Sequence, residues 1–275
     1  MQIKYLGTAA AEAIPALFCH CDICEQARQK KGKEIRARTN VLIDELMIDF
    51  SPDAFYNMVR YDLDYGKLEH LLITHSHVDH FDAAELVMRN PGVYSNGLGN
   101  RVLHLYGNAM VGKVFKKISE IDNQGQAIAG IQFHELTYGV PVRCGSFTVT
   151  ALKANHKPDE DAMIYLLEKE GKHVLYAHDT GELDPSVYAY LKQQHITLDF
   201  VSLDCTCGKL NCRDGHMGFE NMLKVRDRLK PYFKTNTTVA VSHFSHNGKL
   251  SHSELESMCQ KHGIAPTYDG IVFAI

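Results

Sequence analysis

The sequence predicts an α/β protein of the αββα type, in which two mostly antiparallel sheets pack face to face with helices outside. Short runs of apolar and β-branched residues end in polar residues throughout the chain, and helical stretches often follow them. The first half has more consecutive strand-like runs, whereas the second half repeats a strand, a loop and a helix. Because no low-complexity linker or internal repeat divides the 275 residues, and 45% of them are hydrophobic, we expect a single domain over residues 1–275.

Strands are expected where apolar or β-branched residues run together between polar turns. The run at 40–50 is typical of a hairpin that turns near Asp44 and Glu45. In chain order, the expected strands cover residues 3–8, 40–50, 70–75, 102–107, 131–136, 146–154, 162–168, 173–179, 198–205, 238–244 and 270–275.

Helices are expected between many of these strands. The expected helices cover residues 21–31, 52–60, 82–89, 109–121, 185–194, 218–231 and 251–262. The last one begins with Ser251 and has Glu254 three residues later. This spacing predicts a capping box, in which the serine accepts from the third helical amide and the glutamate accepts from the serine amide.

The composition gives no indication of a nucleic-acid or membrane partner. The formal net charge of −4 is mild, so it gives no reason to expect a nucleic-acid or membrane partner. No basic region is joined to an apolar stretch of signal-peptide length, and no apolar run approaches the roughly 20 residues of a membrane helix. We therefore expect a cytoplasmic protein, in which clustered cysteines more often bind metal than pair as disulfides.

A histidine-rich segment follows one of the predicted strands. Residues 71–82 read LLITHSHVDHFD, which places His75, His77, Asp79 and His80 within six positions after an apolar run. Imidazole and carboxylate groups are the usual protein ligands of zinc, manganese and iron. His75 and His77 point the same way while the chain is extended, and the other two reach a second position after the turn. The H-x-H-x-D-H spacing therefore predicts a metal site.

Further potential ligands lie at later strand ends, in KANHKP (153–158), YAHDTG (176–181), VSLDCT (201–206) and AVSHFSH (240–246). With these residues the chain resembles the metallo-β-lactamase superfamily, and most closely its PhnP-like phosphodiesterase branch. That branch has a C-x-C-x-x-C motif near its N-terminus, matched here at residues 19–24. The resemblance runs nearly end to end, although the loop at 9–13 has alanines where glycines are common, so we expect the shape of the loops around the site to differ.

The resemblance implies a site for two divalent metals, either zinc, manganese or iron. One metal would be held by His75, His77 and His156, and the other by Asp79, His80 and His243, with Asp179 bridging the two. The family's aspartate after the early hairpin corresponds to Asp49. The superfamily's redox branch has glutamate at the second histidine position, so His77 favours hydrolysis.

We expect a dinuclear metal-dependent hydrolase, and more narrowly a phosphodiesterase that cleaves a small or cyclic phosphodiester with a hydroxide activated by two metals. The resemblance implies that His216 donates a proton near the leaving oxygen, and Asp79 is expected to act in catalysis as well as in metal binding. Two alternatives are a tRNA 3′-processing nuclease of the same superfamily and a non-catalytic, metal-holding accessory protein in cofactor biosynthesis. The resemblance is also compatible with a homodimer.

Two cysteine clusters complete the candidate sites. Three thiolates at 19–24 leave a tetrahedral zinc one ligand short, and His246 is the best candidate for the fourth, with His20 or a merely buried role for the cysteines as alternatives. The expected structural zinc site thus comprises Cys19, Cys21, Cys24 and His246. The second cluster comprises Cys205, Cys207 and Cys212. For it three readings stay open: unligated thiols lining a loop, a zinc site completed by His216, and a redox clip.

Overall fold

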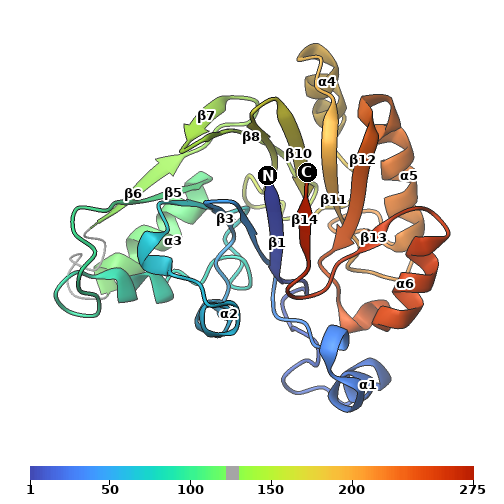
Figure 1. Cartoon of the computed structure of the whole chain (residues 1–275), viewed down its shortest axis with the longest axis horizontal. Coiled ribbons are helices and arrows are strands. Elements are labelled where there is room, and N and C mark those ends of the chain that lie inside the picture. Colours follow the sequence, from blue (N-terminus) through green and yellow to red (C-terminus); the bar gives the residue numbers. More distant parts are fainter. Residues whose placement is uncertain (122–129) are drawn as a thin grey trace.

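The computed structural model describes residues 1–121 and 130–275. Its strands form two sheets that face each other across the middle of the molecule (Figure 1). In spatial order, the first sheet contains β14 (Val272–Ala274), β1 (Gln2–Gly7), β2 (Asn40–Ile43), β3 (Leu46–Ile48), β4 (His70–Leu72), β5 (Leu103–Gly107) and β6 (Ile131–Glu135). The second contains β13 (Ala265–Pro266), β12 (Phe233–Ser242), β11 (Leu198–Asp204), β10 (Lys172–Ala177), β9 (Met163–Lys169), β8 (Phe147–Lys153) and β7 (Pro141–Cys144).

The two-sheet arrangement is confirmed, but the sheets are mixed rather than mostly antiparallel. In the first sheet β14, β1, β2 and β3 pair antiparallel, whereas β3, β4, β5 and β6 pair parallel. In the second sheet β7 to β10 pair antiparallel, whereas β10 to β13 pair parallel. The reason is that parallel neighbours need a crossover connection, and helical segments supply one.

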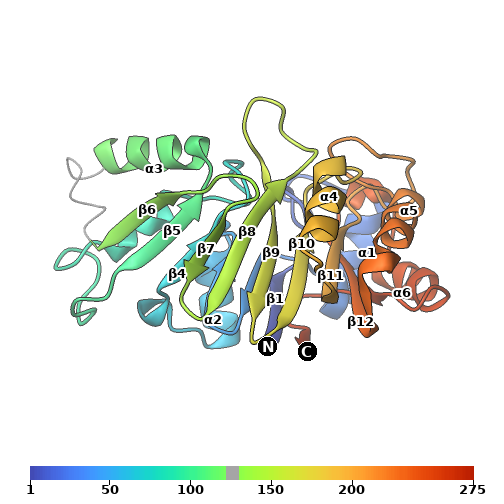
Figure 2. The ribbon, with the colours of Figure 1, turned by 90° about the horizontal axis from the view of Figure 1, so that it is seen from above.

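The helices cover the outer faces of the two sheets, as Figures 1 and 2 show. Their bounds are Asp22–Lys30 for α1, Ala54–Tyr61 for α2, Ala109–Ile121 for α3, Pro185–Gln193 for α4, Phe219–Leu229 for α5 and His252–Gln260 for α6. The capping box predicted at Ser251 and Glu254 is confirmed. The helix expected at 82–89 is wrong, because this stretch forms only a short 3-10 helix at Glu85–Arg89. None of the described helices is long and apolar enough to span a bilayer.

The apolar core has three layers. Large side chains such as Phe147, Tyr165, Tyr176 and Phe200 are fully buried between the sheets. A second layer joins the second sheet to α4, α5 and α6, and a third joins the first sheet to α2 and α3. Because both faces of each sheet are covered, the strands hold the polar loops at their ends in a fixed relation.

Candidate metal centre and substrate pocket

Several strand ends meet at one edge of the two sheets and carry ligand-type side chains. The loop after β4 supplies four of them, and the loops after β8, β10 and β12 supply one each. Two overlapping donor groups contain the expected ligands, and in each of them all ligand atoms lie within 4.8 Å of one another: His75, His77, His156 and Asp179, and Asp79, His80, Asp179 and His243. A third group at the same edge comprises Asp179, Asp204, His216 and His243. The structure therefore brings together every residue that the resemblance implied for the two metals.

The carboxylate of Asp179 lies at the centre of these groups. Its Oδ2 atom is 3.1 Å from Nε2 of both His75 and His80. The same oxygen is 3.3 Å from Nε2 of His156 and 3.9 Å from Nε2 of His243. One carboxylate oxygen thus faces four imidazole nitrogens that come from three different loops, which is the position expected of a bridging ligand.

Protein acceptors hold the opposite nitrogen of several imidazoles. Nδ1 of His80 lies 2.7 Å from Oδ2 of Asp49, the aspartate that the resemblance singled out. Nδ1 of His156 lies 3.0 Å from the carbonyl oxygen of Gly215. A ring N–H that donates to these acceptors leaves Nε2 unprotonated and directed at Asp179. Metal-binding histidines are held in this way.

The crowding of nitrogen atoms tests whether a cation fits the site. Nε2 of His75 and Nδ1 of His77 are only 2.8 Å apart. In this contact one ring nitrogen can donate a proton to the other, and a divalent cation bound by both nitrogens would take the place of that proton. The backbone is also strained here, because Asp49, Asp179 and His243 have φ values of +64°, +50° and +63°. The donor set and its strain both fit a metal centre.

Three of the ligand candidates have protonation states that suit metal binding, whereas at His80, despite burial, Asp49 and Asp79 raise the pKa, so a metal there would displace a proton. Burial alone would raise the pKa of Asp179, but the surrounding imidazoles, His243 foremost, hold it well below its usual range. Burial likewise opposes ionisation of Asp79, yet His80 keeps the pKa of that carboxyl low. Burial lowers the pKa of His156 to about 4, so its ring is neutral at pH 7.

Asp204 is a buried functional residue to which the sequence analysis gave no role. Its Oδ1 accepts hydrogen bonds from the amides of Thr206 and Met217 at 3.0 and 2.8 Å. Its Oδ2 accepts from the Thr206 hydroxyl at 2.7 Å and lies 3.5 and 3.4 Å from Nδ1 of His216 and His243. The Thr206 hydroxyl, which donates to Asp204, also lies 2.7 Å from Nδ1 of His243, so Asp204 and Thr206 together orient the two imidazoles. The sequence did offer one indication of this role, because Asp204 lies at the end of an apolar run, as the ligand candidates do.

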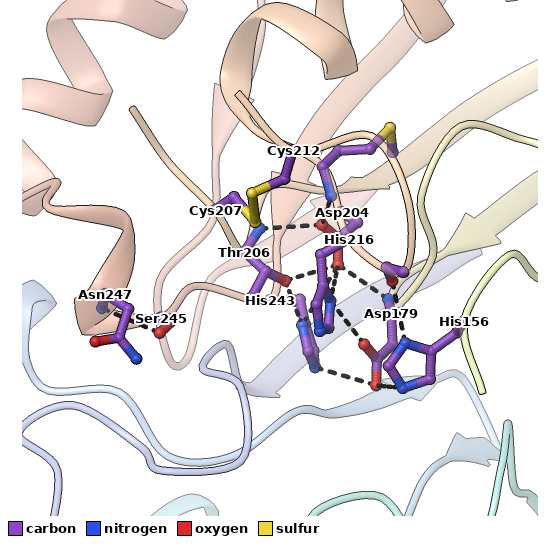
Figure 3. The surroundings of a disulfide bond; sticks show 12 residues. His156, Asp179, Asp204, Thr206, Cys207, Cys212, His216, His243, Ser245 and Asn247 are labelled. Carbon is purple, nitrogen blue, oxygen red and sulfur yellow. Dashed lines mark hydrogen bonds and ion pairs between the residues drawn. A yellow bond between two sulfur atoms is a disulfide. The ribbon is translucent and has the colours of Figure 1, made fainter. Parts of the chain in front are cut away.

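His216 reaches the centre from the loop between β11 and α5. Figure 3 shows its ring beside those of His156 and His243, all directed at Asp179. Its Nδ1 lies 2.9 Å from Oδ1 of Asp179, and its side chain is 32% exposed. Burial would lower the pKa of His216, but contacts with Asp179 and Asp204 raise it to about 10. The two carboxylates therefore favour the protonated form of His216 at the edge of the metal centre.

The second cysteine cluster splits into two parts. Cys207 and Cys212 form a disulfide across the loop that carries His216, with their Cα atoms 6.1 Å apart (Figure 3). Cys205 is a separate, fully buried thiol. This contradicts a zinc site made with His216, whose ring is drawn to two carboxylates instead, and it contradicts three unligated thiols. Of the three readings, the structure agrees with the redox clip, which here is the disulfide between Cys207 and Cys212.

The first cysteine cluster gathers around His246. Nδ1 of His246 lies 3.5 Å from Sγ of Cys19 and 3.3 Å from Sγ of Cys21, and with Cys24 these residues form a four-donor group. Burial opposes ionisation of Cys21, but hydrogen bonds from the Cys24 amide and the His246 ring lower the pKa of its thiol to about 6. His20 turns away to Glu25, at 2.7 Å, so the structure favours His246 as the fourth donor. We call this group the thiolate cluster.

The metal centre opens into a pocket of about 360 Å³. Its inner part is formed by ligand candidates such as His77 and Asp79, together with His216. Its outer wall includes Glu12, from the loop after β1, and Asn247, from the segment after β12. A small molecule in this pocket would therefore touch the donor groups on one side and polar side chains on the other.

A sequence model of the β-lactamase superfamily domain matches residues 39–243. This range runs from the start of the β2–β3 hairpin to His243, and it includes all residues of the two overlapping donor groups. A curated octanoyltransferase from Porphyromonas gingivalis is 32% identical over 85 residues, which cover 29% of this chain and 16% of that protein. The chain thus matches less than a fifth of the length of this curated relative.

Solved structures show the same fold. A diphosphatase from the PhnP family has a TM-score of 0.74 at 20% identity, with 99% of this chain and 96% of that chain covered. Zn²⁺-bound PqqB from Methylobacterium extorquens has a TM-score of 0.75 at 15% identity, with 100% of both chains covered. The short form of human tRNase Z has a TM-score of 0.67 at 14% identity, with 100% of this chain and 99% of that chain covered.

Proposed function

The chain belongs to the β-lactamase superfamily and has the metallo-β-lactamase fold of its hydrolases, and from this premise we propose that it is a dinuclear metal-dependent phosphodiesterase acting on a small or cyclic phosphodiester. The observation that carries the proposal is the position of His216, whose Nδ1 lies 2.9 Å from the carboxylate that links the two donor groups and whose ring lines the pocket. A phosphodiesterase needs such a proton donor because its leaving group is an alkoxide.

The residues divide into three roles. His75, His77 and His156 would hold one divalent cation, and Asp79, His80 and His243 the other, with Asp179 between them. Zinc, manganese and iron all suit imidazole and carboxylate ligands. When bound, two such cations supply the charge that polarises a phosphoryl oxygen and lowers the pKa of a water molecule.

The chain's own part in the reaction centres on His216. Asp179 and Asp204 hold Nδ1 of this residue and keep the ring protonated at neutral pH. The other nitrogen, Nε2, is then free to donate a proton to an oxygen in the pocket that His216 lines. In this role His216 would protonate the leaving oxygen as its bond to phosphorus breaks.

The proposal is tested by measuring metal content and then hydrolysis of bis(p-nitrophenyl) phosphate and of 2′,3′- and 3′,5′-cyclic nucleotides with added zinc or manganese. We expect turnover that is lost in Asp179→Asn. Asp214→Asn is the matched control, because Asp214 lies in the same loop as His216 with 83% of its side chain exposed. Protein that binds metal yet hydrolyses no phosphodiester would refute the proposal and favour the accessory-protein alternative.

A further inference from the structure

Glu12 places a carboxylate in the wall of the pocket that contains the metal centre. It lies in the loop after β1 and lines the same cavity as His77, Asp79 and His216. Its side chain is 28% exposed. Neither metal binding nor leaving-group protonation, as proposed above, uses this carboxylate.

Two neighbours from the segment after β12 fix the position of Glu12. The hydroxyl of Ser245 donates a hydrogen bond to Oε1 of Glu12, and it also accepts one from the amide of Asn247 at 3.1 Å. Nε2 of His246 lies 3.5 Å from the same Oε1 atom. Both contacts of Glu12 use Oε1, so Oε2 is left to interact with a molecule in the pocket.

The thiolate cluster determines which nitrogen of His246 faces Glu12. A zinc ion in the thiolate cluster would bind Nδ1 of His246 together with the sulfur atoms of Cys19 and Cys21, and the ring proton would then be carried by Nε2. The Nε2–H group is then directed at the carboxylate. These contacts hold the Glu12 carboxylate in a fixed position in the pocket wall.

The charge of this wall is not balanced by a nearby basic residue of the pocket. Among the described residues that line the cavity there is neither a lysine nor an arginine. A second phosphate beside Glu12 would meet a like charge, whereas a hydroxyl group would donate a hydrogen bond to the carboxylate. Asn247, also in the wall, offers both donors and an acceptor to the same group.

We infer that Glu12 selects the substituent of the substrate, and that this substituent is an uncharged group with free hydroxyls, such as the sugar of a nucleoside, rather than one that bears a second phosphate. The inference rests on the proposed phosphodiesterase function and narrows its substrate class. The substituent lies against Glu12 and Asn247 while the reacting phosphate lies at the donor groups.

The test compares two substrates with the same leaving group. Thymidine 5′-(p-nitrophenyl phosphate) has a free 3′-hydroxyl, and its 3′-phosphorylated counterpart adds one phosphate. We expect the wild type to prefer the hydroxyl substrate in kcat/KM, and Glu12→Gln to reduce that preference by about tenfold because the like charge is removed. Glu256→Gln, an exposed change on α6, should keep the wild-type ratio. A ratio that is the same in Glu12→Gln and wild type overturns the inference.

Binding separates this inference from the proposed function. Calorimetry of the metal-loaded protein with thymidine 5′-phosphate and thymidine 3′,5′-bisphosphate requires no turnover. We expect the monophosphate to bind more tightly to the wild type and the difference to shrink in Glu12→Gln. If neither substrate is hydrolysed, the phosphodiesterase proposal fails while the calorimetry still decides the role of Glu12. Equal affinities for both nucleotides in the wild type overturn it.

Discussion

The two cysteine clusters begin with the same C-x-C spacing, yet they form different structures. Around Cys21, three sulfurs converge on Nδ1 of His246, which comes from the far end of the chain. In the second cluster, Cys207 and Cys212 pair with each other and Cys205 is buried apart from them. No potential metal-binding group found among residues 1–121 and 130–275 includes a sulfur of the second cluster.

The two clusters differ in whether carboxylates compete with the cysteine sulfurs for the neighbouring histidine. Nothing acidic draws Nδ1 of His246 away from the sulfurs, because Glu12 faces its other nitrogen. His216 follows the second cluster closely in sequence, but the buried carboxylates of Asp179 and Asp204 hold its ring. Cysteine spacing alone therefore does not identify a zinc site. The surroundings of the nearest histidine decide the outcome.

Replacement of His216 should have the largest effect, and it tests whether this residue belongs to the catalytic site or to a metal site with the second cysteine cluster. We expect His216→Ala to lower kcat for a cyclic nucleotide, whose leaving group is an alkoxide, by roughly 100- to 1,000-fold, the scale of a lost general acid. The loss should be much smaller for bis(p-nitrophenyl) phosphate, because p-nitrophenolate leaves without a proton. The unfolding midpoint and the metal content should stay close to those of Asp214→Asn. A variant that loses a metal and unfolds would show that His216 belongs to a metal site with the second cluster after all.

Replacement of Cys21 should mainly affect stability. Cys21 is exposed, so Cys21→Ala removes little packing, but it removes one of four donors. We expect one metal fewer per chain and a loss of about 2–4 kcal/mol in the free energy of unfolding, because metal binding to a closed site contributes to folding. Elemental analysis and urea denaturation measure both quantities. An unchanged metal count together with a purely kinetic defect would contradict the structural role.

Reduction of the disulfide between Cys207 and Cys212 should have a smaller effect. Breaking this bond yields two thiols and frees the loop that carries His216. We expect Cys207→Ser/Cys212→Ser, or wild type treated with a phosphine reductant, to lose about three- to tenfold in kcat with unchanged metal content. Thiol counts before and after reduction establish the state of the bond. Loss of a metal from the double variant would place the second cluster in the same class as the first.

The smallest expected effect is a pH dependence confined to the thiolate cluster. The pKa of the Cys21 thiol is lowered to about 6 in the folded chain, so the unfolded state binds more protons between about pH 6 and 8.5. The resulting stabilisation is complete above the unfolded pKa and is lost as the pH falls through 6. Urea unfolding of metal-free, reduced protein should therefore show a stability difference between wild type and Cys21→Ser that grows over this range, while the opposite contribution of His216 is common to both and cancels. A difference that does not change with pH would contradict the assignment to Cys21.

Much of the fold was predictable because strand positions follow directly from apolar runs. The hairpin at 40–50 and the helix at 109–121 were placed correctly. Strand direction was not predictable, since it depends on which connections cross between neighbours. The short edge strands β7 and β13 were missed because each has few residues and contains a proline.

The donor groups were predictable for a related reason. Each ligand candidate follows an apolar run, and strand ends on one edge of a sheet meet in space. Asp204 and Glu12 were not assigned because their roles depend on contacts between segments far apart in the chain. Asp204 orients His243, and Glu12 meets Ser245 across more than two hundred positions of sequence. No local pattern encodes such a contact.

The segment after β12 places His243, Ser245 and His246 within four consecutive positions. The first faces the metal centre, the second holds Glu12 and the third faces the thiolate cluster. Inserting or deleting one residue here would turn at least one of these side chains to the wrong side. Descendants of this chain can therefore change this stretch by substitution but not in length, and its spacing should outlast most of the surrounding sequence.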